Sequence, residues 1–117
     1  GFMFWNGNCF TSLSYPHGAA TEKGIIMRIA LVTHDKLGYL HIRMENREAH
    51  LAYLKRTGVV EMAGPFLDAD KKMCGSLIIL DIKDMASAEA WAENDPYNKA
   101  GLFENVTLKI WKKVIGQ

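Results

Sequence analysis

Cysteine is scarce in this sequence, and long apolar runs are missing. The 117 residues include two cysteines, Cys9 and Cys74, which are too few for a disulfide framework and lack the spacing of a zinc site. No apolar run approaches the roughly 18 residues that a membrane-spanning helix needs. We therefore expect a protein of a reducing compartment, the cytoplasm, without a membrane partner.

An excess of charge of one sign is also absent. The 14 Lys and Arg residues are balanced by 13 Asp and Glu residues, which gives a formal net charge of +1 at pH 7. A nucleic-acid-binding domain usually carries a basic patch. The Leu-Ile-Ile-Leu run at residues 77–80 also lacks the aromatic residues of RNA-recognition strands. The sequence therefore argues against a nucleic-acid partner. Its hydrophobic share of 49% is typical of a globular chain, and its length suits one domain.

The first 26 residues differ in pattern from the rest of the chain. They begin with an aromatic-rich stretch without a clear period and continue with turn-forming residues such as Pro16 and Gly18. Either they are an extension upstream of the folded domain, or they form an arm that packs on the domain or on a partner. Because a strand pattern begins at Met27, we expect an N-terminal extension at 1–26 and one domain at 27–117.

From Met27 onward, strand and helix patterns alternate. Apolar, β-rich runs predict four strands, and the segments between them predict two helices and one further helical turn. The predicted strands span residues 27–34, 59–66, 73–82 and 104–114, and the predicted helical segments span 46–57, 85–94 and 97–103. Residues 35–43 are expected to form a loop, and residues 67–72 a polar turn.

Four residues mark the ends of the predicted helices. Asn46 and Asp84 suit N-caps, because their side chains can accept hydrogen bonds from free backbone N–H groups. Gly58 suits the left-handed conformation that follows many helices. Pro96 ends the second helix, because its ring disfavours helical geometry at the preceding residue.

This β-α-β-β-α-β order predicts an α+β, ferredoxin-like fold with an antiparallel four-stranded sheet. Two helices can cover only one face of that sheet. The strands at 27–34 and 73–82 are apolar on both faces, whereas a strand with one face in water should alternate apolar and polar residues. A second copy of the chain is the simplest cover for the bare face, with residues 1–26 as the alternative. We therefore expect a homodimer in which two sheets stack, a dimeric α+β barrel.

His50 and Asp95 are the candidate catalytic residues. His50 shares a side of its helix with Leu54, which should face the sheet, so its imidazole is expected to be half-buried. An imidazole beside a carboxylate makes an effective general base near neutral pH. Asp95 ends the second helix on the same face of the sheet and can supply that carboxylate. A helical histidine is more commonly structural, however, and an aspartate before proline is commonly only a helix stop.

Several segments resemble the YciI-like (YCII-related) family. They are REAHLAYL at residues 47–54, AGP at 63–65, GS at 75–76 and AWAENDPY at 90–97. Their order and spacing are similar to that family across about residues 27–115. The resemblance implies a dimeric α+β barrel and a cleft in which His50 and Asp95 form a catalytic pair. It also directs attention to Ser76 and Tyr97, which occupy matching positions.

The resulting hypothesis is an enzyme that transfers protons on a small organic acid, by lyase, isomerase or dehydrohalogenase chemistry. Arg47 would hold a substrate carboxylate, because a guanidinium group matches its geometry. Ser76 and Tyr97 would donate hydrogen bonds to a developing oxyanion. Each has a simpler interpretation: Arg47 as a solvated charge, Ser76 as a small residue in a crowded strand, and Tyr97 as a cap on the core. No cofactor is expected.

Two alternatives remain open. The same cleft could bind a small-molecule ligand without turnover, in a metabolite-binding or regulatory dimer. A metal site formed by His34, Asp35 and His41 is conceivable, although polar loop residues are more commonly solvated.

Overall fold

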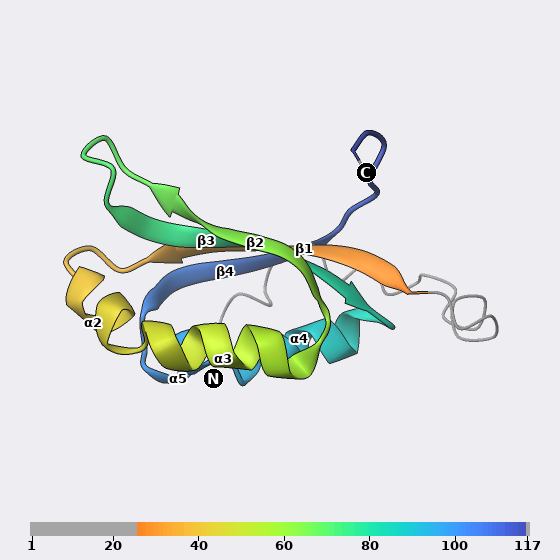
Figure 1. Cartoon of the computed structure of the whole chain (residues 1–117), viewed down its shortest axis with the longest axis horizontal. Coiled ribbons are helices and arrows are strands. Elements are labelled where there is room, and N and C mark those ends of the chain that lie inside the picture. Colours follow the sequence, from red (N-terminus) through yellow and green to blue (C-terminus); the bar gives the residue numbers. More distant parts are fainter. Residues whose placement is uncertain (1–25, 117) are drawn as a thin grey trace.

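The computed structural model describes residues 26–116, so nearly all of the predicted N-terminal extension lies outside the described residues. The strands are β1 (Met27–Asp35), β2 (Val60–Leu67), β3 (Met73–Ile82) and β4 (Phe103–Ile110). The helices are α2 (Leu40–Glu45), α3 (Arg47–Thr57), α4 (Met85–Glu93) and α5 (Pro96–Lys99). Figure 1 shows these helices together on one side of the sheet.

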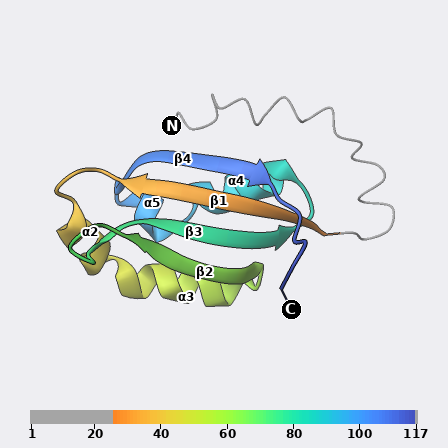
Figure 2. The same ribbon diagram turned by 90° about the horizontal axis from the view of Figure 1, so that it is seen from above.

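The sheet confirms the predicted α+β, ferredoxin-like fold. Its strand order is β2-β3-β1-β4, and each neighbouring pair is antiparallel. The two central strands, β1 and β3, are therefore far apart in the sequence but adjacent in space (Figure 2). None of the helices among residues 26–116 is long and apolar enough to cross a membrane.

The connection after β1 differs from the prediction. The expected loop at 35–43 contains the start of α2, a six-residue helix whose N-cap, Tyr39, forms no side-chain capping bond. Asn46 does not cap α3 with its side chain, because α2 ends directly before α3 and the Asn46 amide donates back to the Ile42 carbonyl at 2.9 Å. Asp84 does cap α4, accepting from the Ser87 N–H at 2.8 Å. Gly58 adopts the predicted left-handed conformation, with φ of 69°.

The predicted ends of the last elements were less accurate. The helical turn expected at 97–103 is α5, which begins at Pro96 and ends at Lys99, and β4 ends at Ile110 rather than at residue 114.

The hydrophobic core lies between the sheet and the helices. Ile29 and Leu80 are paired across β1 and β3 and are fully buried, and Trp91 of α4 packs beneath the same sheet face. Two hydrogen bonds tie α3 to α4: the Tyr53 hydroxyl donates to the Trp91 carbonyl at 2.8 Å, and the Trp91 indole donates to Thr57 Oγ1 at 2.9 Å. These contacts fix α3 against the C-terminal end of α4.

The opposite sheet face is apolar at its centre and carries no helix from the described residues (Figure 1). Cross-strand pairing places five apolar side chains on it: Ala30, Val32, Met62, Leu77 and Ile79. Met62 is 49% exposed and Leu77 is 38% exposed. The sheet therefore has apolar residues on both faces, as the patterns of β1 and β3 predicted.

Candidate functional site

His50 and Asp95 are in direct contact. The His50 Nδ1–H donates to Asp95 Oδ1 at 2.8 Å, a proton assignment that follows from the acceptor-only character of a carboxylate. His50 is 5% exposed and Asp95 is 1% exposed, so His50 is more deeply buried than predicted. With Nδ1 bonded to the carboxylate, the other ring nitrogen, Nε2, is left without a hydrogen-bond partner within residues 26–116.

The position of Asp95 follows from the Asp-Pro sequence. Asp95 has the extended conformation that proline imposes on the preceding residue, with φ of −64° and ψ of 130°. Its Oδ1 also accepts from the Tyr97 N–H at 2.9 Å, which makes Asp95 the N-cap of α5. Asp95 therefore ends one helix, caps the next and holds His50. Its other oxygen, Oδ2, is buried without a hydrogen-bond partner among residues 26–116.

Tyr97 packs directly on His50. The two ring centroids are 3.8 Å apart, with an angle of 11° between the ring planes. Burial raises the pKa of the Tyr97 hydroxyl, and the charges of Arg43 and Arg47 oppose this rise only in part. The hydroxyl therefore stays protonated at neutral pH.

Arg43 is a site residue that the sequence reasoning missed. It lies in α2, is 2% exposed, and donates to both carboxylate oxygens of Asp35, at 2.7 Å from Nε and 3.0 Å from Nη2. Nη2 also donates to Ser76 Oγ at 3.0 Å, and the guanidinium lies 4.6 Å from the centroid of the Tyr97 ring. Burial by itself would lower the pKa of Arg43, but the hydrogen bond and charge of Asp35 outweigh it and raise the pKa, so Arg43 stays charged.

The metal hypothesis for residues 34, 35 and 41 is wrong. Asp35 is bonded to Arg43, whereas His34 points to the other sheet face and stacks on Phe66 with ring centroids 5.7 Å apart. His41 is exposed on α2. No cluster of potential metal ligands occurs among residues 26–116.

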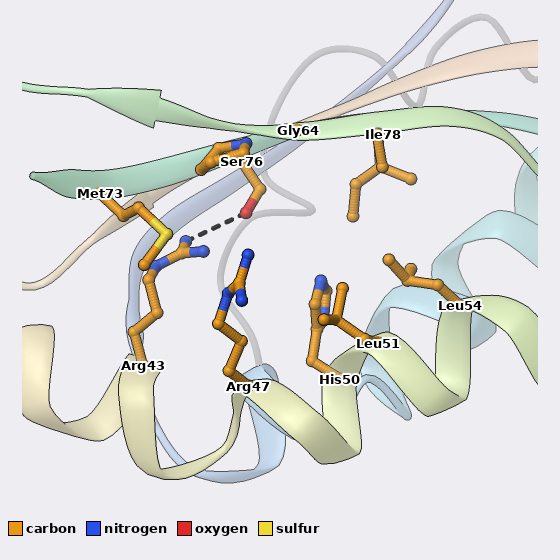
Figure 3. Close-up of a pocket in the computed structure, with 11 residues that line it drawn as sticks. Arg43, Arg47, His50, Leu51, Leu54, Gly64, Met73, Ser76 and Ile78 are labelled. Carbon is orange, nitrogen blue, oxygen red and sulfur yellow. Dashed lines mark hydrogen bonds between the residues drawn. The ribbon is translucent and has the colours of Figure 1, made fainter. Parts of the chain in front are cut away.

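A pocket of about 140 Å³ lies between α3 and the strands β2 and β3 (Figure 3). Its polar lining consists of Arg43, Arg47, His50 and Ser76, and apolar side chains of α3 and β3 form much of the rest. No carboxylate lines the pocket, and Arg47 has no ion pair within the described part of the chain. The pocket therefore favours a ligand with negative charge.

The predicted site residues are thus mostly brought together. His50, Arg47 and Ser76 line one pocket, Asp95 holds His50 from behind, and Tyr97 is buried beside His50 without lining the pocket. An imidazole held in this way can accept a proton at Nε2, while the carboxylate stabilises the imidazolium that forms.

The family model of the YCII-related domain matches residues 27–112. The chain belongs to this family. Protein YciI of Escherichia coli O6:H1 strain CFT073 is 35% identical over 97 residues, which cover 75% of this chain and 99% of that protein. An uncharacterized protein of Haemophilus influenzae is 32% identical over the same length and coverage. The resemblance to the YCII-related family that the sequence motifs indicated is therefore confirmed.

Two solved structures extend the comparison. The 5-chloro-2-hydroxyhydroquinone dehydrochlorinase TftG of Burkholderia phenoliruptrix AC1100, solved in complex with 2,5-dihydroxybenzoquinone, has a TM-score of 0.71 and 35% sequence identity. The match covers 75% of the YCII-related chain and 96% of TftG. An antibiotic biosynthesis monooxygenase, 9% identical with a TM-score of 0.51 over 76% of this chain and 99% of that one, shares the fold.

Proposed function

We propose that this protein is an enzyme that moves protons on a small organic acid, with His50 as the general base and acid and Asp95 as its orienting partner. The observation that carries this proposal is the 2.8 Å contact between His50 Nδ1 and Asp95 Oδ1, in a pair that is buried next to a cationic pocket. The carboxylate keeps the Nδ1 proton in place, so Nε2 has a free electron pair for the substrate.

Dehydrohalogenation is the reaction class that we favour, because a 35% identical structural relative is a dehydrochlorinase. On a chlorinated hydroxyhydroquinone, Nε2 would take a proton from a ring hydroxyl and return it to the chlorine-bearing carbon. Loss of a second hydroxyl proton would then drive its electron pair into a new C=O bond, shift the ring π electrons and expel chloride. The net change is loss of one proton and one chloride ion, so no external oxidant or reductant is required.

The other polar residues suit binding of such a substrate. Arg47 would pair with a substrate carboxylate or phenolate, and Ser76 would donate to a developing oxyanion. Tyr97 is too deeply buried to contact a substrate directly, so we assign it to positioning the His50 ring.

The pocket volume suits a small substrate. A cavity of about 150 Å³ inside a protein is known to hold one benzene molecule. The pocket here, at about 140 Å³, therefore has room for a single ring or a short-chain acid.

We further propose that the protein is a homodimer formed through the helix-free sheet face. An apolar side chain that buries about 100 Å² gains roughly 2.5 kcal/mol, and a two-fold axis uses each such residue twice. The exposed Leu77 lies on the central strand β3 of that face, and the exposed Met62 lies on the neighbouring edge strand β2.

The proposed activity is tested by incubating the purified chain with 5-chloro-2-hydroxyhydroquinone and measuring chloride release with an ion-selective electrode. We expect release above the rate without protein, saturating with substrate. Saturable binding with neither chloride release nor exchange of a solvent proton into the bound molecule would instead identify a metabolite-binding protein.

A further inference from the structure

The Arg43 guanidinium is held in one orientation before any ligand arrives. Asp35 accepts two of its hydrogen bonds, Ser76 accepts another, and its central carbon lies over the Tyr97 ring, 4.6 Å from the centroid. A guanidinium group held by these three hydrogen bonds and the ring contact cannot turn toward a substrate without breaking hydrogen bonds inside the protein. Arg43 is therefore better suited to hold protein groups than to follow a ligand.

The charge of Arg43 is also compensated. Asp35 is buried with it, at a side-chain exposure of 5% for Asp35 and 3% for Arg43, so the pair contributes little net charge to the pocket. Arg47 is the lining residue that keeps an uncompensated positive charge within the described part of the chain. This difference separates the two arginines, although both line the pocket.

The contact with Arg43 determines what the Ser76 hydroxyl can do. A serine hydroxyl has one donor hydrogen and two acceptor electron pairs. Because an Arg43 N–H already points at Oγ, the Ser76 hydrogen must point away from the guanidinium, and Ser76 lines the pocket (Figure 3). A cation bonded to Oγ also polarises the hydroxyl and makes it a stronger donor.

We propose that Arg43, fixed by Asp35, is a positioning residue that directs the Ser76 hydroxyl into the pocket as a donor to the anionic oxygen of a single-ring enolate or phenolate. The assignment rests on the proposed function for its ligand class. Arg47 supplies the charge that attracts this anion, and Ser76 supplies the directed hydrogen bond that holds its oxygen beside His50. The pocket therefore prefers an anion over a neutral molecule of the same shape.

The test is a mutant cycle on the binding of 2,5-dihydroxybenzoquinone, measured by titration calorimetry with the full chain. The variants are Ser76→Ala, the charge-neutral pair Asp35→Asn with Arg43→Gln, and all three substitutions together. Ser76→Ala is expected to weaken binding by about tenfold to a hundredfold, which is typical for loss of a hydrogen bond to a charged group. The Asp35–Arg43 pair variant should cause a similar loss when Ser76 is present, but less than about threefold when Ser76 is already alanine.

A purely structural role of Arg43 would give a different pattern, because its loss would weaken binding by the same factor whether position 76 is serine or alanine. Such additivity would overturn the assignment, and so would wild-type protein that fails to bind the probe. Arg56→Gln is the matched control, since Arg56 also lies over a tyrosine ring, 5.3 Å from Tyr53, but does not line the pocket. It should leave the affinity unchanged.

Circular dichroism checks that each variant is folded. If the double substitution unfolds the chain, Arg43→Lys replaces it, because an ammonium group keeps the charge but cannot bond Asp35 and Ser76 in the same fork geometry. The outcome is separable from that of the proposed function. If a His50 variant kept the full rate of turnover, the His50 mechanism would be disproved. Non-additive effects of the Arg43 and Ser76 substitutions on binding would still leave this assignment intact.

Discussion

Tyr97 lies flat against His50, and its backbone N–H donates to the same Asp95 oxygen that accepts from His50. The short Asp-Pro-Tyr segment thus holds the imidazole at its edge through the carboxylate and at its face through the phenol ring. Because Asp95 and Tyr97 are two residues apart, one local conformation fixes both contacts. Among the residues that the structure describes, one ring nitrogen of His50 has no hydrogen-bond partner, and the ring has little freedom to rotate.

The Tyr97 ring, rather than its hydroxyl, should therefore matter for activity. Tyr97→Phe keeps the stacking surface and should change kcat for chloride release by less than about threefold, whereas Tyr97→Leu removes an aromatic pair and should cost about 2 kcal/mol of unfolding free energy. Urea unfolding measures the second effect. A loss of kcat well beyond threefold in the Phe variant would assign the effect to the hydroxyl instead.

Asp95 should be needed for its charge. Asp95→Asn is expected to lower kcat by about 10²–10⁴-fold, because an amide no longer stabilises the imidazolium and can favour the wrong tautomer. Asp84→Asn is the matched control, since it removes a carboxylate elsewhere and keeps a residue that can cap α4. Equal rates for the Asp95 variant and this control would reduce Asp95 to a helix cap.

The sequence predicted the parts of the fold that depend on local pattern. Asp84 and Gly58 have local signals and behave as predicted. The α2 helix has six residues and no side-chain cap, so nothing local distinguishes it from a loop. Arg43 was missed for the same reason: its partners Asp35 and Ser76 lie on two different strands, and only the folded sheet brings them together. An arginine between the apolar residues Ile42 and Met44 was the available signal.

The His50–Asp95 contact was predicted only with help from the family resemblance. The spacing of 45 residues between the two is not a motif, and it becomes a contact because Tyr53, Trp91 and Thr57 fix α3 against α4. The stacking of Tyr97 on His50 was not predicted, because it depends on the direction in which α5 leaves Asp95.

The proposed homodimer is tested by placing a charge on the helix-free sheet face. Leu77→Lys should raise the dimer dissociation constant on the order of 10³-fold, since two buried side chains of roughly 2.5 kcal/mol each are lost per dimer. Light scattering after size-exclusion chromatography measures the mass at micromolar concentration. Leu37→Lys, at a 99% exposed position away from the sheet, should remain dimeric. A monomeric wild-type chain would disprove this interface.

Stability should fall in strong alkali because of Tyr53. Burial first, and the nearby Asp95 charge second, raise the pKa of its hydroxyl to about 12. An unfolded tyrosine ionises near pH 10, so the unfolded state loses its proton first and stability declines between about pH 10 and pH 12. Tyr53→Phe should cost about 1 kcal/mol at pH 8 through the lost bond to Trp91, yet show a shallower alkaline decline. Urea unfolding at pH 8 and pH 11 measures both, and parallel declines in the two proteins would contradict the assignment.

The role of His50 is measured most directly by kcat for chloride release from 5-chloro-2-hydroxyhydroquinone in the His50→Gln variant. Glutamine retains polarity and approximate size but cannot exchange a proton near neutral pH. We predict a loss of at least about 10²-fold in kcat, with the variant still folded and still binding 2,5-dihydroxybenzoquinone. A variant that releases chloride as fast as the wild-type protein would contradict proton transfer by His50.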